Sequence, residues 1–356
     1  MSNSTATLHS AALERLPRQE SFSRTFRRRA VSVPAFLLGA LLAVLLAPLL
    51  YPIAFTIDLV GRRRLATVRA VAMAHVYLGC EAAGIVASAW IWVAHRRDRE
   101  RFLGQNFRLQ CWWANSIYRA GVHVFGVSVV VEGDELVTAG PITVFSRHVS
   151  PIDNLIPAVL ISNAHDMRLR WVINRSLLRD PCLDIVGNRL PNCFVATSSG
   201  NSDAEIRRVE TLGRGLGERD GVLIYPEGTL FSPARRARVI RRIESAGDAT
   251  LLERARRLEN VLPPRLGGSL ALLDAARGAD AVFLAHTGLE DSTAYRSIIG
   301  GGLIGRKVRI RMRRVPAAEI PPTREARIDW LYENWEELDR WVSANSAQTR
   351  PEVFLA

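Results

Sequence analysis

Residues Ile142 to Asp153 read ITVFSRHVSPID, and residues Val222 to Ser232, further along the chain, read VLIYPEGTLFS. Each stretch begins with a short apolar run that has the length and composition of a buried strand. Each run then ends at a turn that is marked by proline or glycine and carries one acidic residue, and the first turn also carries a histidine. Open α/β sheets bind their ligands at the carboxyl ends of their strands. The two stretches therefore predict a functional site at one edge of such a sheet.

The chain from about residue 105 onward alternates between strand and helix patterns. Strands are expected at 141–145, 170–173, 193–196, 221–225, 281–285 and 307–315, with helices between them at 154–162, 176–186, 203–216, 240–259 and 268–277. This alternation predicts an α/β fold with a mixed central sheet flanked by helices. A last helix over 324–344 places apolar residues at helical spacing, which predicts that it docks on the domain. These residues are Ile328, Leu331, Trp335, Leu338 and Val342.

The N-terminal third contains two long apolar segments. Ala30 to Ile57 carries no charge, and a bilayer-spanning helix needs only about 20 apolar residues. Leu65 to Ala94 is interrupted by Arg69, His75 and Glu81, which favours a helix that packs on a partner or lies at the membrane interface. Three prolines in the first segment leave open a kinked helix or insertion into one leaflet. They are Pro34, Pro48 and Pro52.

These patterns divide the chain into a polar basic tail (1–29), a membrane-anchoring two-helix region (30–104) and a catalytic domain with its C-terminal helix (105–356). Basic residues flank the apolar segments in similar number at 24–29, 62–64 and 96–101, so the positive-inside rule gives no orientation. If both segments cross the membrane, the N-terminus and the large domain lie on the same side.

The formal net charge of +12 comes almost wholly from arginine, and it fits a membrane surface or an anionic substrate. The basic clusters flank apolar segments and do not interleave with aromatic residues, which argues against nucleic acid as the main partner. The four cysteines show neither a CxxC pair nor metal-ligand spacing, so no disulfide framework or zinc site is indicated.

His148 is followed five residues later by Asp153, a spacing that also occurs at His286 and Asp291 and is therefore weak by itself. Ser150, Pro151 and Asp153 also fit a helix start, in which the acid caps backbone amides and needs no other role. Both interpretations remain open from these residues alone.

The two stretches together, in this order, resemble the lysophospholipid acyltransferase family, whose bacterial prototype is 1-acyl-glycerol-3-phosphate acyltransferase. A His, four residues and an Asp mark that family, followed further on by Pro-Glu-Gly-Thr. The resemblance covers roughly residues 142–289, and it also predicts hydrophobic N-terminal helices. Leu262 to Gly268, LPPRLGG, resembles the Pro-Arg block of the lysocardiolipin-type branch.

The resemblance implies acyl transfer from a thioester to a lipid hydroxyl. A neutral imidazole is well suited to take the hydroxyl proton, so His148 is expected to be the general base. Asp153 is expected to fix the tautomer of His148 and to stabilise the imidazolium. The implied substrate-binding residues are Glu227, Gly228, Thr229, Arg147, Arg175 and Phe194.

The chain departs from the family at two places that help to bind the phosphate of the acceptor. Residues 191–197, PNCFVAT, keep Phe194 and Val195 of the block Gly-x-x-Phe-Ile-x-Arg but have Pro for Gly and Thr for Arg. Leu230, not Arg, follows Thr229. A lysophospholipid with a larger head group, or an acceptor without phosphate, therefore becomes a better candidate than lysophosphatidate. Arg147, Arg175 and Arg189 are possible substitutes. The basic residues at 235–242 fit anionic head groups, the phosphates of coenzyme A or a solvated face.

We therefore expect a membrane-bound O-acyltransferase of lipid metabolism that acts on acyl-CoA, or acyl carrier protein, and a lysolipid acceptor. Membrane lipids are the expected partners, with no nucleic acid, no metal and no cofactor besides the acyl-CoA co-substrate. The inner or plasma membrane is the expected location, with the catalytic domain in the cytoplasm. A thioesterase or lysophospholipase that uses the same His-Asp pair is one alternative, and a non-catalytic membrane scaffold is another.

Overall fold

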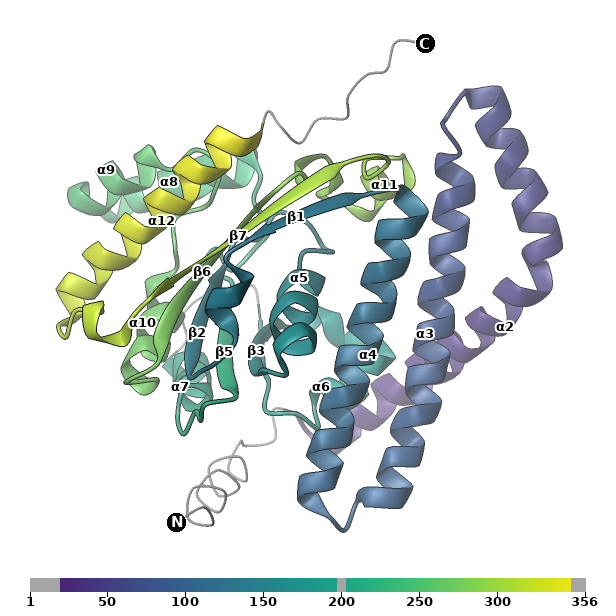
Figure 1. Cartoon of the computed structure of the whole chain (residues 1–356), viewed down its shortest axis with the longest axis horizontal. Coiled ribbons are helices and arrows are strands. Elements are labelled where there is room, and N and C mark those ends of the chain that lie inside the picture. The colour runs from purple at the N-terminus through teal and green to yellow at the C-terminus, as the bar shows by residue number, and fades with distance from the viewer. Residues whose placement is uncertain (1–19, 197–202, 347–356) are drawn as a thin grey trace.

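A seven-stranded mixed sheet forms the centre of the molecule in the computed structural model, which describes residues 20–196 and 203–346 (Figure 1). The strand order is β1-β7-β6-β2-β5-β3-β4, and every neighbouring pair is parallel except β6 and β7. The strands are β1 (Ser128–Glu132), β2 (Ile142–Ser146), β3 (Arg168–Asn174), β4 (Cys193–Val195), β5 (Asp220–Ile224), β6 (Asp280–Thr287) and β7 (Lys307–Val315). The predicted fold class is confirmed.

Strands β2 and β5 carry the two stretches that mark the sequence, and they lie side by side. They pair in parallel with Ile142 opposite Gly221 and Phe145 opposite Ile224. Parallel neighbours end at the same edge of the sheet, so the His148 turn and the Glu227 turn meet there.

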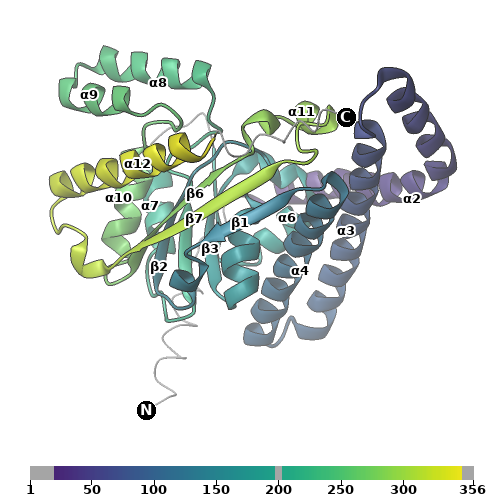
Figure 2. The same cartoon turned by 45° about the horizontal axis from the view of Figure 1, so that its top comes forward.

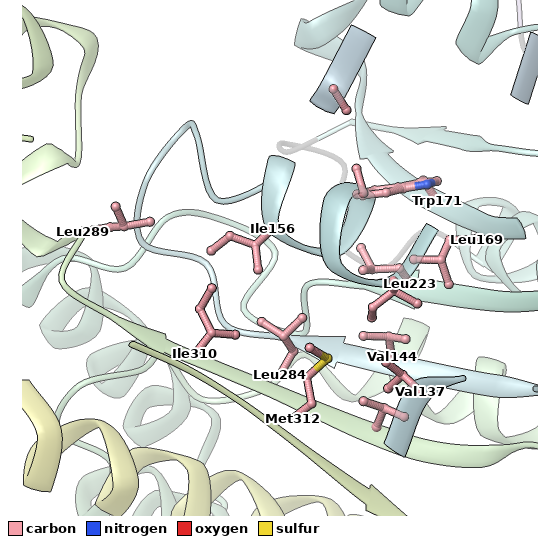
Figure 3. Close-up of a cluster of buried hydrophobic side chains, with 14 of the residues drawn as sticks. Val137, Val144, Ile156, Leu169, Trp171, Leu223, Leu284, Leu289, Ile310 and Met312 are labelled. Carbon is pink, nitrogen blue, oxygen red and sulfur yellow. The ribbon is translucent and has the colours of Figure 1, made fainter. Parts of the chain in front are cut away.

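Side chains that alternate along the strands fill two cores, one on each face of the sheet. On β2, Val144 belongs to the first core and Phe145 to the second. Figure 3 shows the first core, where Val144, Leu223 and Leu284 from the sheet approach Ile156. Helices α4 (Arg99–Phe125) and α5 (Leu155–Pro157), which continues as the π-helix η2 (Ala158–Asn163), cover this face. Helices α7 (Asp203–Leu212), α10 (Leu266–Ala275) and α12 (Arg324–Ser346) cover the other.

Helix α12 docks on the second face as its apolar spacing predicts. Leu331, Trp335 and Val342 are fully buried, and Leu338 is nearly so. The indole nitrogen of Trp335 donates a hydrogen bond to the carbonyl oxygen of Leu262 at 3.0 Å. The helix therefore also fixes the segment that precedes α10.

Several local elements differ from the sequence prediction. Strand β1 and helix α4 were not predicted. The helix expected at 240–259 is two helices, α8 (Pro233–Ala246) and α9 (Ala249–Arg257), because Gly247 takes a left-handed conformation and Asp248 caps α9. The remaining short elements are η1 (Asp134–Val137), η3 (Arg175–Arg179), α6 (Pro181–Gly187), η4 (Glu290–Ser292), α11 (Tyr295–Ile299) and η5 (Ala317–Glu319).

The two apolar segments form helices α2 (Phe22–Gly61) and α3 (Ala66–His95), both long and apolar enough to cross a membrane by length and composition. Figures 1 and 2 show α2 bending sharply instead of running straight, and its three internal prolines account for such a bend. Large apolar side chains are exposed along α2. Helix α2 begins within the expected polar tail, of which residues 1–19 lie outside the described residues.

A carboxylate closes the turn between the two helices. Both oxygens of Asp58, in the last turn of α2, accept hydrogen bonds from the backbone amides of Thr67 and Val68 at 2.9 Å. These amides belong to the first turn of α3, where helical partners are missing. Asp58 therefore ties the two helices into a hairpin.

Helix α3 packs on the α/β domain through Glu81, one of the charges that interrupt its apolar sequence. Glu81 is fully buried and accepts hydrogen bonds from the indole of Trp113 in α4 at 2.6 Å and the amide of Cys182 in α6 at 3.1 Å. One turn along, a Cβ on Gly84 would lie 2.7 Å from the sulfur of Cys182. The close approach of α3 to α6 at this point therefore requires glycine. The expectation that this segment packs on a partner is confirmed.

The start of α2 is also held against the α/β domain. Asp184 of α6 is fully buried and accepts hydrogen bonds from the guanidinium groups of Arg28 and Arg29 at 2.9–3.2 Å. These ion pairs place the N-terminal end of α2 beside α6.

Candidate active site

His148 and Asp153 form a direct pair at the carboxyl end of β2. The Nδ1 atom of His148 lies 2.8 Å from Oδ1 of Asp153. Asp153 is fully buried, whereas the His148 side chain keeps 17% of its surface exposed. Nε2 of His148 has no hydrogen-bond partner within the described residues. The imidazole is thus anchored on one nitrogen and open on the other.

Asp153 also fixes the backbone around the histidine. Its Oδ2 atom accepts hydrogen bonds from the amides of Val149 and Ser150 at 2.7 and 2.9 Å. The capping role and the histidine-orienting role, which the sequence left as alternatives, are therefore both present in one carboxylate. Three donors on a buried acid explain why it remains ionised.

The ionisation of the pair suits a general base. Burial acts to lower the pKa of His148, but the charge and the hydrogen bond of Asp153, with a smaller effect of Glu227, raise it above its ordinary value. Burial acts to raise the pKa of Asp153, yet His148 and the backbone donors bring it below its ordinary value. Tyr225 packs against the imidazole with ring centroids 4.3 Å apart.

A cavity of about 380 Å³ opens in front of His148. It runs between the turns that follow β2 and β5 and the helices beside them. Gly228 and Thr229, both predicted to bind substrate, line it. Apolar walls come from residues that include Trp171, Ile173 and Val209. A site with one base and largely apolar walls can accommodate an amphiphile with a reactive polar group.

Glu227 joins the two turns from behind the cavity. It is buried, with Oε1 accepting from the backbone amide of His148 at 2.8 Å and Oε2 from the amide of Leu262 at 2.9 Å. Burial raises its pKa to about 7, against the opposing effect of these two hydrogen bonds. Its carboxylate does not line the cavity. The structure therefore places Glu227 behind the cavity, where it joins the turn of His148 to Leu262.

Arg147 is buried and is bonded to other parts of the protein. Only 1% of its side chain is exposed. Its guanidinium donates to the carbonyl oxygens of Asn260 and His286 and to the carboxylate of Glu290. Arg147 brings the pKa of Glu290 to about 2, although burial acts in the opposite direction. Four of its five N–H donors are thus used inside the protein, and Arg147 does not line the cavity.

Phe194, Arg175 and Arg189 lie outside the cavity as well. Phe194, which was predicted to contact substrate, is buried in the first core. One guanidinium nitrogen of Arg175 is 3.4 Å from the carbonyl oxygen of Phe194. Arg189 is bound to Ser88 and Asn106. Thr197, which replaces the arginine of the family block, lies outside the described residues.

His286 occupies a place that its spacing did not predict. It is fully buried behind Asp153, with Nε2 3.6 Å from Oδ2 of that carboxylate and 3.1 Å from the carbonyl oxygen of Arg147. Asp291, its partner by spacing, pairs with Arg306 instead. Asp153 is therefore flanked by two imidazoles, and only His148 reaches the cavity.

Residues 259–262 connect the site to the C-terminal helix. The carboxylate of Asp339 in α12 accepts from the amides of Glu259 and Asn260 at 3.1 and 2.6 Å. The same segment provides the Leu262 amide to Glu227 and the Asn260 carbonyl to Arg147. The position of His148 thus depends on α12 through this segment.

Comparison with known proteins finds a family model that matches the region of this site. Residues 128–267, which include His148, Asp153 and the Glu227 turn, match the family model named Acyltransferase. No curated protein sequence matches the chain. The crystal structure of the 1-acyl-sn-glycerophosphate (LPA) acyltransferase PlsC from Thermotoga maritima is 16% identical to it, with a TM-score of 0.49, over 80% of this chain and 97% of that chain.

The match to the acyltransferase domain agrees with the enzyme class expected from the sequence, an O-acyltransferase. Among residues 20–196 and 203–346, no group of three or more His, Cys, Asp or Glu side chains is placed to hold a metal ion. The four cysteines are buried and free.

Proposed function

We propose that the protein transfers a fatty acyl group from acyl-CoA, or from an acyl carrier protein, to the hydroxyl group of a lysophospholipid or related lipid. The observation that carries this proposal is the arrangement of His148, with Nδ1 on buried Asp153 and Nε2 facing the cavity. No resident cofactor takes part in the proposed reaction, and acyl-CoA is a co-substrate.

In this reaction Nε2 of His148 takes the proton of the acceptor hydroxyl as its oxygen attacks the thioester carbonyl carbon. The buried Asp153 stabilises the imidazolium that forms. The carbon–sulfur bond of the resulting tetrahedral intermediate then breaks, and the imidazolium returns the proton to the thiolate. The products are the ester and the free thiol. The lipid supplies the nucleophile, so no acyl-enzyme forms.

The proposal also places the enzyme on a membrane. Helices α2 and α3 provide an apolar surface, and α3 is packed on the catalytic domain through Glu81. Two amphiphilic substrates then reach the cavity without leaving the bilayer completely. We propose that the catalytic domain faces the cytoplasm, where acyl-CoA is made, and that the membrane is the inner or plasma membrane.

A panel of lysolipid acceptors with one labelled acyl-CoA tests the function. The enzyme in detergent or nanodiscs is expected to form a new acylated lipid, identified by mass spectrometry. His148→Ala should lower the rate by about 10²-fold or more. His123→Ala, an exposed histidine of α4 outside the cavity, is the control and should retain the wild-type rate. If the label were found only in free fatty acid, the activity would be that of a hydrolase and the proposed acyl transfer would be refuted.

A further inference from the structure

Arg265 is an arginine whose backbone is fixed but whose charge has no partner. Its amide donates to the carbonyl oxygen of Pro226 at 2.8 Å, and its own carbonyl oxygen accepts from Ser269 at 3.1 Å. Within the described part of the chain, its guanidinium forms no hydrogen bond or ion pair. The side chain is half-buried and lines the cavity that holds His148. A buried cation without a counter-ion is costly unless a ligand supplies one.

The guanidinium lies directly against the Gly228 turn. A Cβ on Gly228 would be 2.5 Å from Nε of Arg265 and 2.7 Å from its central carbon. Gly228 has a φ of +65° as well, so both its backbone conformation and the closeness of Arg265 require glycine. The turn that follows β5 is therefore shaped to receive this side chain.

A second arginine reaches the same cavity from helix α8. Arg235 donates to the carbonyl oxygen of Leu230 at 2.9 Å, and it also lines the cavity. Its charge acts on His148 and opposes the rise in the pKa of that imidazole. Arg242 lies two turns further along α8. Burial of Arg265 lowers the pKa of its guanidinium, and the charge of Arg242 lowers it further. Glu205, an acid that also lines the cavity, accepts a hydrogen bond from the amide of Ala196.

We propose that Arg265 and Arg235 form an anion subsite that binds a phosphate group of a substrate on the Gly228 side of His148. The inference rests on the proposed function. A guanidinium presents parallel N–H donors that fit phosphate oxygens, and partial burial strengthens the attraction. This chain has Leu230 at the position that follows Thr229 and therefore lacks a positive charge there. Arg265 and Arg235, which lie 35 and 5 residues further along the chain, supply positive charge instead. The phosphate belongs either to the lipid acceptor or to coenzyme A.

Paired substrates distinguish these two sources. Lysophosphatidate and monoacylglycerol differ in the acceptor phosphate, whereas acyl-CoA and acyl-pantetheine differ in the donor phosphates. Arg265→Gln is expected to raise the KM of the phosphate-bearing member of one pair by about 10- to 100-fold and to leave its phosphate-free member unchanged. Arg265→Lys should give an intermediate KM, because lysine keeps the positive charge but lacks the parallel N–H donors of the guanidinium. Arg238→Gln, exposed on α8 and outside the cavity, is the matched control.

A rise in KM for lysophosphatidate but not for monoacylglycerol assigns the subsite to the lipid. A rise in KM for acyl-CoA but not for acyl-pantetheine assigns it to coenzyme A. Equal KM changes for both members of each pair, or no change, would overturn the proposal. If the wild-type protein acylates no acceptor, the proposed function fails, and binding then tests the subsite alone. Glycerol 3-phosphate or coenzyme A should raise the unfolding temperature of the wild-type protein but not that of Arg265→Gln. An equal response of the two proteins would refute the subsite.

Discussion

The backbone amide of His148 donates a hydrogen bond to Oε1 of Glu227 at 2.8 Å, across 79 residues of sequence. This contact joins the two turns that the parallel strands β2 and β5 bring to one edge of the sheet. The second oxygen of Glu227 holds Leu262, so three segments of the chain meet at one carboxylate. The geometry of the base is therefore set by a residue that does not line the cavity.

Glu227→Gln is expected to lower kcat by about 10-fold or more while leaving the KM of both substrates nearly unchanged. Glutamine accepts only one of the two amide hydrogen bonds, and its NH2 group then opposes the other amide. The turn that carries His148 shifts, but the cavity walls remain. Steady-state kinetics against each substrate measures the effect. A rise in KM at constant kcat would return Glu227 to a substrate-binding role.

Asp153→Asn should reduce the rate by about 10²-fold or more and move the acid limb of the kcat/KM profile to lower pH. Oδ2 of Asp153 accepts two amides, so asparagine would place its oxygen there and turn its NH2 group toward Nδ1 of His148. The imidazole then carries its proton on Nε2 and is no longer a base.

The direction of the pH shift follows from charge. Asp153 raises the pKa of His148, so the wild-type enzyme loses its neutral base as the pH falls through a value above 6.5. Removal of the carboxylate lowers that pKa. A pH–rate profile from pH 5 to 9 measures both proteins, and an acid limb that stays in place would contradict the assignment of His148 as the base.

Gly228→Ala should destabilise the protein, because a residue with a side chain at φ +65° costs about 1–2 kcal/mol and the new Cβ displaces Arg265. Combining it with Arg265→Gln should recover part of the loss, with a coupling of about 0.5–3 kcal/mol. Gly247→Ala is the control, since its φ is +78° but no atom lies within 4 Å of its Cβ position. Thermal unfolding measures the stabilities of the single and double variants. The effects of Gly228→Ala and Arg265→Gln should not add, whereas those of Gly247→Ala and Arg265→Gln should be additive.

Asp184→Asn should release the beginning of α2 and speed tryptic cleavage after Arg28 and Arg29. The buried carboxylate accepts hydrogen bonds from both guanidinium groups, and removing its charge leaves them without this ion pair. Glu210→Gln is the control, because Glu210 pairs with Arg214 on the surface and lies on α7. Cleavage at equal rates in all three proteins would show that Asp184 does not hold the helix.

The sequence was informative where local pattern and burial agree. The apolar runs before His148 and Glu227 predicted two strands that end at one site, and the spacing of Leu331, Trp335 and Val342 predicted a docked helix. Side-chain direction was not predictable in the same way. Arg147 is adjacent to His148, and Phe194 belongs to a family block. Arg147 nevertheless points between β6 and the segment at 260, and Phe194 points into the core.

Contacts between distant segments account for the rest. The pairing of Asp153 with His286 and the packing of Arg265 on Gly228 depend on strand order and on the path of the chain before α10. Neither leaves a periodic signal. The break between α8 and α9 did have a local signal, Gly247 followed by Asp248. The prediction of one helix over 240–259 did not use it.

The dependence of residues 259–262 on Asp339 and Trp335 has a consequence for biosynthesis. The ribosome releases His148, Asp153 and Glu227 long before it has translated α12, so the nascent chain holds every reacting group without the brace that aligns them. Its apolar N-terminal helices emerge first and can enter the membrane at once. We therefore expect the His148 turn to take its final position only after α12 has been made and has docked.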